Sequence, residues 1–397
     1  MKGLFSHLAA TPDHKDWEQL TARRHALYQR ETMRDEFYRD YTRILHCTAF
    51  RRLKHKTQVF PHVESDHICT RMEHVLHVES VSHTVAEHLG LNTSLTRAIS
   101  MGHDIGHAPF GHEGEKVLSS LAEEHLGRRF WHEQNGLRFA DGIELLQDPK
   151  GVWRNLGLTY AVRDGILCHC GEVDENALRP REELLDLASF TRPGEHQSAT
   201  WEGCVVKLAD KIAYLGRDIE DAAALGFLGD AGRAALSDLQ KRYGMDPLNT
   251  TGIMHTLICD VCATSTPERG IALSHEACTL MDEVKALNYE YIYTHPRFVP
   301  FRRYARLVIE EVFGALAELY TGKPYPPADA AVHFPTLVGG FANFVRPYLA
   351  APLEGYDNEK LYGDLSDRTL YLTAVTDYIA GMTDAFLIRA YTELVSF

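Results

Sequence analysis

Histidine is the residue type most able to do chemistry in this sequence. The 397 residues include 22 histidines, and 13 of them lie between His46 and His132. Imidazole binds divalent metal ions and exchanges protons near neutral pH, so this cluster predicts metal or acid–base chemistry. The pair His103–Asp104 lies between Gly102 and Gly106. Adjacent residues on a regular helix diverge by about 100°, so both reach one ion only if the helix ends there, and the glycines permit that bend.

Two predicted helices bring further ligands to this pair. His74 lies on the apolar face of a helix expected over 74–89, and Asp210 lies on a helix expected over 201–224. The four side chains together offer two imidazoles and two carboxylates. Such mixed ligands suit a borderline transition metal in a roughly octahedral shell better than a closed tetrahedral zinc site. A single histidine on an apolar face is more often a core residue, and it is the combination that favours a metal site.

Helix spacing groups two further sets of side chains. His112 and Glu115 are three residues apart, so they share one face of a helix that starts nearby. A carboxylate in that position can fix the tautomer of the imidazole and raise its basicity. Asp210, Tyr214 and Asp218 recur at four-residue intervals and must project in nearly one direction.

The elements that position these residues are predicted to be helical almost throughout. Apolar residues recur at three- and four-residue intervals over 74–89, and Gly90 follows as an expected C-terminal cap. Thr93 is the expected N-cap of the next helix, which breaks at Gly102. Strand-like alternation is scarce, and no glycine-rich phosphate loop follows a strand. The predicted fold class is all-α, with a helical bundle core and additional C-terminal helices.

The chain is expected to divide into three parts. We predict an N-terminal helical segment at 1–45, a catalytic core at 46–225 and a C-terminal helical portion at 226–397 that packs on the core. No apolar run approaches the roughly 20 residues of a membrane helix, and no signal peptide is evident at the start. The eight cysteines are scattered, so a cytoplasmic protein without membrane contact is expected.

Charge restricts the ligands that the chain can attract. With 41 Lys and Arg against 55 Asp and Glu, the net charge is −14, so an anionic ligand needs a metal or a locally positive pocket. The segment Arg23–Lys56 is an exception, because it holds ten basic and four acidic residues. It is interpreted either as a solvated helix face or as a face that meets the phosphates of a nucleotide or of single-stranded nucleic acid.

The ordered set of His74, His103–Asp104 and Asp210 resembles the HD-domain metal-dependent phosphohydrolases. Longer strings resemble the deoxynucleoside triphosphate triphosphohydrolase (dNTPase) branch, including its bacterial dGTPase-like members. These strings are Phe50 to Leu53 leading to Gln58, Thr70 to His74, Gly102 to Glu115, Gly165 to His169, Leu208 to Tyr214 with Arg217–Asp218, and Asp377 to Asp384. The resemblance covers about residues 30–391. It implies that the catalytic core predicted at 46–225 is an HD domain.

Members of this family cut a dNTP at the α-phosphorus and release deoxynucleoside and inorganic triphosphate. The resemblance implies one divalent ion, Mn²⁺ by preference or else Mg²⁺, Fe²⁺, Co²⁺, Ni²⁺ or Zn²⁺. The implied metal ligands are His74, His103, Asp104 and Asp210. The resemblance further implies that His112 and Glu115 form the catalytic dyad. His107 and His132 are implied to contact phosphate or the leaving oxygen, with loop stabilisation as the alternative.

Substrate contacts are carried over in the same way. Arg71 and Lys211 match positions that grip the triphosphate, and Tyr214 and Asp218 match positions that hold the deoxyribose and its 3′-hydroxyl. Gln58 matches a position near the sugar and base. A tyrosine packed on the sugar leaves little room for a 2′-hydroxyl, which rejects ribonucleotides sterically. A salt-bridge role for Arg71 and a surface role for Gln58 are the alternatives.

One departure from the bacterial pattern concerns base preference. The dGTPase-like members usually continue their later histidine with Asn-x-Gln-Ser, whereas here His132 is followed by Glu-Gln-Asn-Gly. This string is closer to the animal dNTPase that carries a sterile-alpha-motif domain, and it leaves the choice between dGTP and several dNTPs open.

Two other classes of function compete with this hypothesis. One is another HD phosphohydrolase, such as a nucleotide phosphatase, a cyclic-nucleotide phosphodiesterase or an alarmone hydrolase. The other is a nucleotide sensor or a protein that binds single-stranded nucleic acid through Arg23–Lys56. The family resemblance also implies a homo-oligomer, commonly a tetramer or hexamer, and an allosteric dNTP at a second site.

Overall fold

The computed structural model describes residues 3–27, 29, 32–61, 67–170, 177–245, 249–324 and 328–396. The α-helices are α1 (Trp17–Leu20), α2 (Glu36–His46), α3 (Thr48–Arg52), α4 (Arg71–Leu89), α5 (Thr93–Gly102), α6 (Gly111–Leu126), α7 (His132–Arg138), α8 (Tyr160–Cys168), α9 (Trp201–Ala224), α10 (Gly229–Tyr243), α11 (Thr250–Thr264), α12 (His275–Asn288), α13 (Phe298–Glu318), α14 (Ala328–His333), α15 (Gly340–Val345), α16 (Arg368–Ala380) and α17 (Asp384–Val395). Short 3₁₀ or π turns are η1 (Leu53–His55), η2 (Phe139–Ile143), η3 (Leu187–Ser189), η4 (Tyr289–Tyr293), η5 (Pro335–Gly339) and η6 (Arg346–Tyr348).

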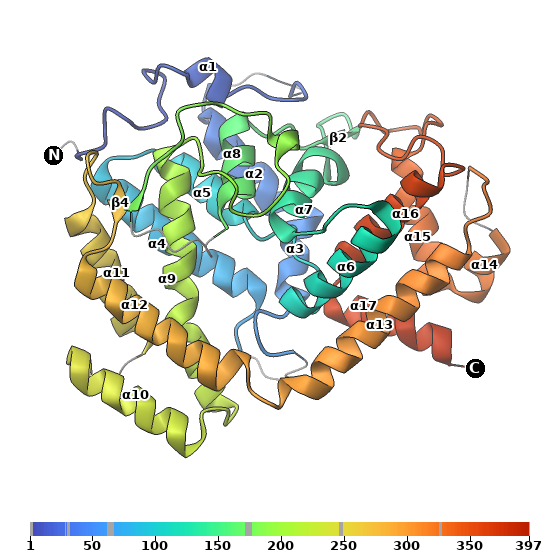
Figure 1. Cartoon of the computed structure of the whole chain (residues 1–397). Coiled ribbons are helices and arrows are strands. Elements are labelled where there is room, and N and C mark those ends of the chain that lie inside the picture. The colour runs from blue at the N-terminus through green and yellow to red at the C-terminus, as the bar shows by residue number, and fades with distance from the viewer. Residues whose placement is uncertain are drawn as a thin grey trace.

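The fold is all-α, as predicted from the sequence (Figure 1). Its strands are β1 (Leu145–Gln147), β2 (Trp153–Asn155), β3 (Ala177–Leu178) and β4 (Ile271–Ala272). They form two antiparallel pairs, β1 with β2 and β3 with β4. Within the described residues, no helix combines the length and the apolar character that crossing a bilayer requires.

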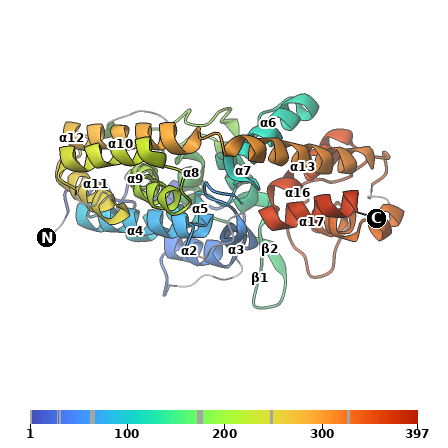
Figure 2. The ribbon, with the colours of Figure 1, turned by 90° about the horizontal axis from the view of Figure 1, so that it is seen from below.

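The centre of the fold is built from α4, α5 and α9, which pack on one another, while α2 and α8 cover α5. Their apolar faces merge into one hydrophobic core that extends from Phe5 to Ala390. Figure 2 shows α4, α5 and α9 together on one side of the molecule and α13, α16 and α17 together on the other. The predicted division at 1–45, 46–225 and 226–397 stays a prediction.

Helix α4 begins earlier than predicted because its start is capped. The Thr70 hydroxyl accepts the backbone N–H of Glu73, and the Glu73 carboxylate accepts the backbone N–H of Thr70. This capping box satisfies two donors that a helix start leaves free, so the helix begins at Arg71 and not at His74. At the other end Gly90 has φ 80°, which confirms the predicted left-handed cap.

The prediction that Thr93 caps α5 is wrong by one residue. Asn92 is the cap, because its side-chain oxygen accepts the backbone N–H groups of Ser94 and Leu95. Asparagine is the stronger capping residue of the two. The predicted end of this helix at Gly102 is confirmed.

The C-terminal helices contact the middle of the chain through buried polar bonds. Arg138 at the end of α7 donates to both carboxylate oxygens of Asp377 on α16, and the Tyr362 hydroxyl donates to the same carboxylate. Lys56 is buried and donates to the backbone carbonyls of His107 and Ala380. Residues 377–384 therefore reach the loops that surround the histidine cluster.

Candidate functional site

Three helices bring His74, His103 and Asp210 together. Asp210 Oδ1 lies 2.9 Å from His74 Nε2 and 3.8 Å from His103 Nε2. The ligand atoms of the three residues all lie within 4.8 Å of one another. His74 lies in the first turn of α4, His103 caps the end of α5, and Asp210 lies in the middle of α9. Residues distant in sequence thus meet at one point, as expected.

Asp104 adjoins this group and has further partners. Its Oδ1 lies 3.5 Å from His103 Nε2, and its Oδ2 lies 3.9 Å from His74 Nε2. The same carboxylate pairs with Arg71 Nη1 at 2.8 Å and with His107 Nε2 at 2.9 Å. The structure therefore brings all four predicted ligands together, and it also shows Arg71 in the salt bridge that was its alternative role.

The chemistry of these donors fits a divalent cation. His103 Nδ1 contacts the Ser100 carbonyl oxygen at 2.7 Å, and its Nε2 is buried without a hydrogen-bond partner among the described residues. Burial lowers the pKa of His103 to about 4, so this ring is neutral and Nε2 offers a lone pair. Burial would raise the pKa of Asp210, but the hydrogen bond from the neighbouring His74 ring lowers it to about 2. An ionised carboxylate beside a desolvated lone pair is what a cation requires.

The glycines beside the HD pair have a different role from the predicted one. Neither Gly102 nor Gly106 has a positive φ. A Cβ on Gly106 would lie 2.1 Å from both the His132 carbonyl oxygen and the Gly136 nitrogen, and a Cβ on Gly102 would lie 2.7 Å from Ile166. The glycines therefore allow α7 and α8 to approach the pair closely.

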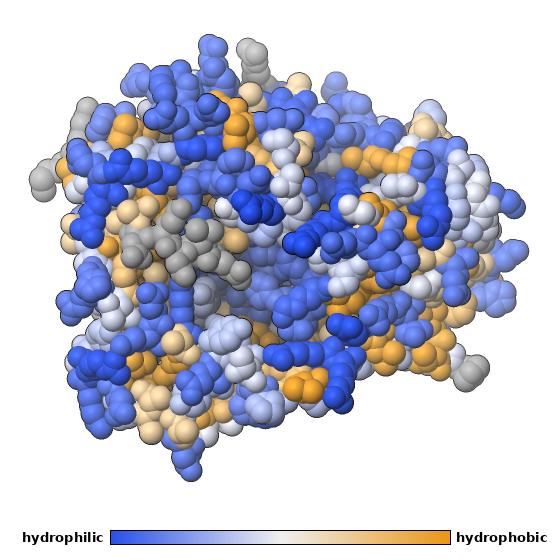
Figure 3. Space-filling model, in the orientation of Figure 1, coloured by the Kyte–Doolittle hydropathy of each residue, from blue (hydrophilic) through white to orange (hydrophobic). Residues whose placement is uncertain are grey.

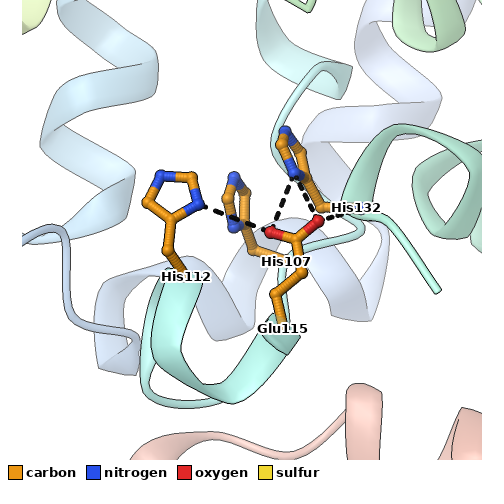
Figure 4. Close-up of side chains that lie close together, drawn as sticks. All are labelled: His107, His112, Glu115 and His132. Carbon is orange, nitrogen blue, oxygen red and sulfur yellow. Dashed lines mark hydrogen bonds and ion pairs between the residues drawn. The ribbon is translucent and has the colours of Figure 1, made fainter. Parts of the chain in front are cut away.

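Glu115 joins two histidines at the second cluster (Figure 4). Glu115 Oε2 lies 3.4 Å from His112 Nδ1 and 3.2 Å from His132 Nδ1, and Glu115 Oε1 accepts the backbone N–H of His132. The His107 ring stacks on the His132 ring with centroids 3.9 Å apart. The predicted pair of His112 and Glu115 is in place, but the carboxylate is shared with His132.

The histidines of this cluster differ in exposure and charge. The His112 side chain is 64% exposed, whereas the His132 side chain is 14% exposed. Burial would lower the pKa of His132, but Glu133 and Glu115 raise it to about 10, so His132 is cationic at neutral pH. Burial and the charge of Arg71 hold the pKa of His107 well below its usual value. Of the three, His112 alone has the exposure that exchange with bulk water favours.

The turn before His112 has an unusual backbone. Phe110 has φ 63°, and it is the one residue other than glycine with positive φ among the described ranges; Gly111 follows with φ 59°. Asp384, at the start of α17, accepts the Phe110 N–H at 2.9 Å through Oδ1. Its Oδ2 accepts both the N–H and the hydroxyl of Thr57, the neighbour of Gln58. One carboxylate thus holds two loops of the site. Its bond to the Phe110 N–H also helps to offset the strain of the left-handed backbone conformation at Phe110.

The predicted substrate residues lie around these clusters. Arg71 Nη2 donates to the backbone carbonyl of Gln58 at 3.4 Å, and the Gln58 side-chain oxygen is buried without a hydrogen-bond partner among the described residues. Lys211 and Asp218 are buried on α9, and Tyr214 between them is half-buried. The face of the molecule seen in Figure 1 is mostly hydrophilic and is hollowed near its centre (Figure 3).

Two residues of the site were not predicted from the sequence. The Tyr293 hydroxyl, at the end of η4, donates to Asp218, whose pKa burial raises to about 7. His169 caps the end of α8, and its ring centroid lies 4.9 Å from that of His103 and 5.4 Å from that of His132. Two signals for His169 were available: it ends the string Gly165 to His169 that carries the family resemblance, and it follows an apolar run, as His103 does.

Part of the basic segment Arg23–Lys56 is bonded within the fold, whereas Arg24, Arg51 and Lys54 are exposed. Arg23 pairs with Asp40 and Glu36, Arg43 donates to backbone carbonyls at 155 and 156, and Arg52 donates to the Gly381 carbonyl. Residues 28, 30 and 31 lie outside the described residues. Arg23 is therefore neutralised by carboxylates, and the two roles expected for the segment stay predictions.

Comparison with known proteins identifies the core. Residues 71–215 match the model of the HD domain. The chain is 33% identical over 364 residues to a deoxyguanosinetriphosphate triphosphohydrolase-like protein of Caldanaerobacter subterraneus, covering 91% of this chain and 85% of the relative. Proteins with the same description from Rickettsia bellii and Ruegeria sp. are each 30% identical, and the alignments cover 91% and 92% of this chain and 92% and 94% of those proteins.

Proposed function

The chain belongs to the deoxyguanosinetriphosphate triphosphohydrolase-like family of HD-domain hydrolases, and on this premise we propose that it cleaves dNTPs to deoxynucleoside and inorganic triphosphate. The observation that carries the proposal is the buried group of His74, His103, Asp104 and Asp210 beside Arg71. A divalent ion bound there, Mn²⁺ by preference, supplies Lewis-acid stabilisation of the charge that develops on the α-phosphate.

The phosphate-binding part of the proposal depends on cations of this chain. Arg71 is buried and fixed by Asp104, so its guanidinium is oriented before substrate arrives. Lys211 is buried next to Asp210 on α9. Fixed cations reduce the reorganisation that binding a triphosphate requires. They also explain how a chain of net charge −14 attracts a polyanion.

The second cluster supplies the proton transfers. His112 Nδ1 faces Glu115, so Nε2 is the atom that takes a proton from the attacking water. His132 is cationic and held by Glu115, which suits a contact with the phosphate or with the leaving 5′-oxygen of the sugar. His107 is neutral and bonded to Asp104, so it would orient the Asp104 carboxylate, which lies between the two clusters.

The sugar is proposed to lie along α9. Tyr214 and Asp218 follow Asp210 at four-residue intervals, so they extend away from the phosphate end on the same face of the helix. Tyr214 would pack on the deoxyribose and exclude a 2′-hydroxyl. Asp218 would accept a hydrogen bond from the 3′-hydroxyl. Gln58 approaches from the opposite loop.

Product analysis tests the proposal. The purified protein is incubated with dGTP, dATP, dCTP and dTTP, singly and mixed, with Mn²⁺ or Mg²⁺, and products are separated by chromatography. A parallel incubation contains GTP. We expect deoxynucleoside and intact triphosphate in equal amounts from the dNTPs, and no turnover of GTP. Release of monophosphate or pyrophosphate would instead identify another HD phosphohydrolase.

Assembly and regulation belong to the same proposal. The family resemblance favours a homo-oligomer, a tetramer or hexamer, and an activating dNTP at a second site. The mixed-nucleotide incubations detect activation by a second dNTP directly, since an activator-dependent enzyme shows no turnover of one nucleotide alone and hydrolyses the mixture. Sedimentation with and without dNTPs measures the oligomer.

A further inference from the structure

Two consecutive peptide carbonyls of the loop after the HD pair are held by buried side chains. Asn135 Nδ2 donates to the Gly106 carbonyl oxygen at 2.7 Å, and Lys56 Nζ donates to the His107 carbonyl oxygen. These two peptide groups lie on either side of the His107 Cα atom. Since the backbone of a residue has only two soft dihedral angles, the two bonds together fix the direction in which the His107 side chain projects.

Asn135 joins this loop to α7. It is buried and lies three residues after His132, so about one helical turn separates it from the cationic ring. Helix α7 can approach the loop this closely because residue 106 is a glycine, and a Cβ there would lie 2.1 Å from the Gly136 nitrogen. The His107 ring stacks on the His132 ring with centroids 3.9 Å apart. The Asn135 bond therefore holds the backbone of one ring to the helix that carries the other.

Lys56 joins the same loop to the start of α4. Its ammonium group is buried, which costs free energy unless hydrogen bonds satisfy it, and its second bond goes to the Ala380 carbonyl oxygen at 3.1 Å. The Lys56 carbonyl oxygen accepts the backbone N–H of Arg71 at 3.2 Å. Lys56 thus contacts the backbone of both His107 and Arg71, the two residues whose side chains bond to Asp104.

We propose that Lys56 and Asn135 are positioning residues that fix the ring of His107 in the phosphate-binding site. The inference rests on the proposed function, because that function gives the ring its task. Neither side chain needs to touch the substrate, since each acts through the backbone of His107. A substitution at either position should therefore affect catalysis only while the imidazole is present.

Crystal structures of two variants test the placement of the ring. Lys56→Met keeps nearly the length of the side chain and removes the ammonium group, and Asn135→Leu keeps the volume and removes the amide. In each variant we expect the His107 ring to leave its stacked position on His132. Lys56→Gln and Asn135→Asp, which also remove these donors, replace a variant that does not fold.

Matched controls remove the same kinds of bond outside the two clusters of the site. Lys360→Met removes the bond from Nζ to the Pro347 carbonyl oxygen, and Asn155→Leu removes the bond from Nδ2 to the Gly142 carbonyl oxygen. In both controls the His107 ring should stay in place, and kcat per folded chain should match that of the wild type.

Kinetics separate positioning from stability. Per folded chain, Lys56→Met and Asn135→Leu should each lower kcat roughly 10- to 100-fold, the usual cost of a misplaced catalytic group. In a His107→Ala background the same substitutions should have no further effect, because the ring through which they act is gone. A purely structural role would lower kcat by the same factor in both backgrounds.

Two results overturn the proposal: variant structures in which the His107 ring keeps its place, or losses of kcat that persist in full in the His107→Ala background. The crystal structures do not depend on the reaction. A wild-type chain that releases no triphosphate therefore contradicts the proposed function alone, while the structures of Lys56→Met and Asn135→Leu still decide whether these residues position the ring.

Discussion

The two halves of the site are held by different means. The proposed metal-binding half, formed by His74, His103 and Asp210, is built from helices of the hydrophobic core, and its rings are buried. The proposed proton-transfer half, formed by His112 and Glu115, lies on the first turn of α6 and is partly open to solvent.

This difference matches what each half is proposed to do. A ligand set needs fixed donors that water does not satisfy, which packing within the core provides. A general base needs access to water and a carboxylate that orients it, so it lies at the edge. We call the group of His74, His103 and Asp210 the core half, which burial holds in place. We call the pair of His112 and Glu115 the edge half, which depends on contacts from distant segments, especially Asp384.

The largest effect should come from the core half. Asp210→Ala removes the carboxylate that lies between His74 and His103, and it leaves the buried His74 imidazole without its acceptor. We expect loss of the ion bound there and turnover below detection in the dNTP assay. Metal analysis of the folded variant checks this, with folding verified by circular dichroism. A variant that retains its metal and full activity contradicts the four-ligand assignment.

The edge half should separate chemistry from metal binding. His112→Ala removes the proposed base, and turnover should fall by roughly 10²–10⁴-fold, the usual contribution of general base catalysis. The metal content should stay at the wild-type value because His112 is outside the core half. Glu115→Gln is the matched variant and should lower turnover as well. Loss of metal in His112→Ala would show that the halves are not separable.

Asp384 should affect the edge half from a distance. Asp384→Asn exchanges one acceptor oxygen for a donor, so the Phe110 and Thr57 loops can no longer both be held. A misplacement of this kind costs roughly 10- to 100-fold in kcat, while metal content stays unchanged. Thr57→Val removes only the hydroxyl contact, so its loss should be smaller. Equal losses of metal and activity in Asp384→Asn would instead mean general unfolding.

The smallest effect should come from the cap of α4. Thr70→Ala removes the hydroxyl of the capping box and should lower the free energy of unfolding by about 1 kcal/mol, measured by urea denaturation. Since packing holds His74 in place, kcat and metal content should match the wild type. A large loss of metal would mean that the core half depends on local helix stability as well as on burial.

Local features of the fold were predictable from the sequence, and long-range ones were not. The bounds of α9 agree with the predicted 201–224 because its apolar stripe and its cap at Thr200 are encoded in neighbouring residues. The start of α4 was missed by three residues although it is marked locally, because Thr70 and Glu73 have the spacing of a capping box. Gly106 is needed because α7 packs closely against it, and no pattern among its sequence neighbours predicts that contact.

The same distinction applies to the site. The ligand residues were identified from spacing and from family resemblance, and the structure brings them together. His169, Tyr293 and Asp384 depend on tertiary contacts with residues far along the chain. The sharing of Glu115 between two histidines likewise arises from the packing of α6 against the start of α7.

The place of Asp384 in the chain has a consequence for biosynthesis. It lies 274 residues after Phe110 and 327 residues after Thr57. During translation both loops leave the ribosome long before the carboxylate that holds them. A chain that has not yet reached Asp384 therefore lacks the carboxylate that holds the turn before His112. If the proposed function holds, hydrolysis should begin only after the chain has been synthesised through Asp384.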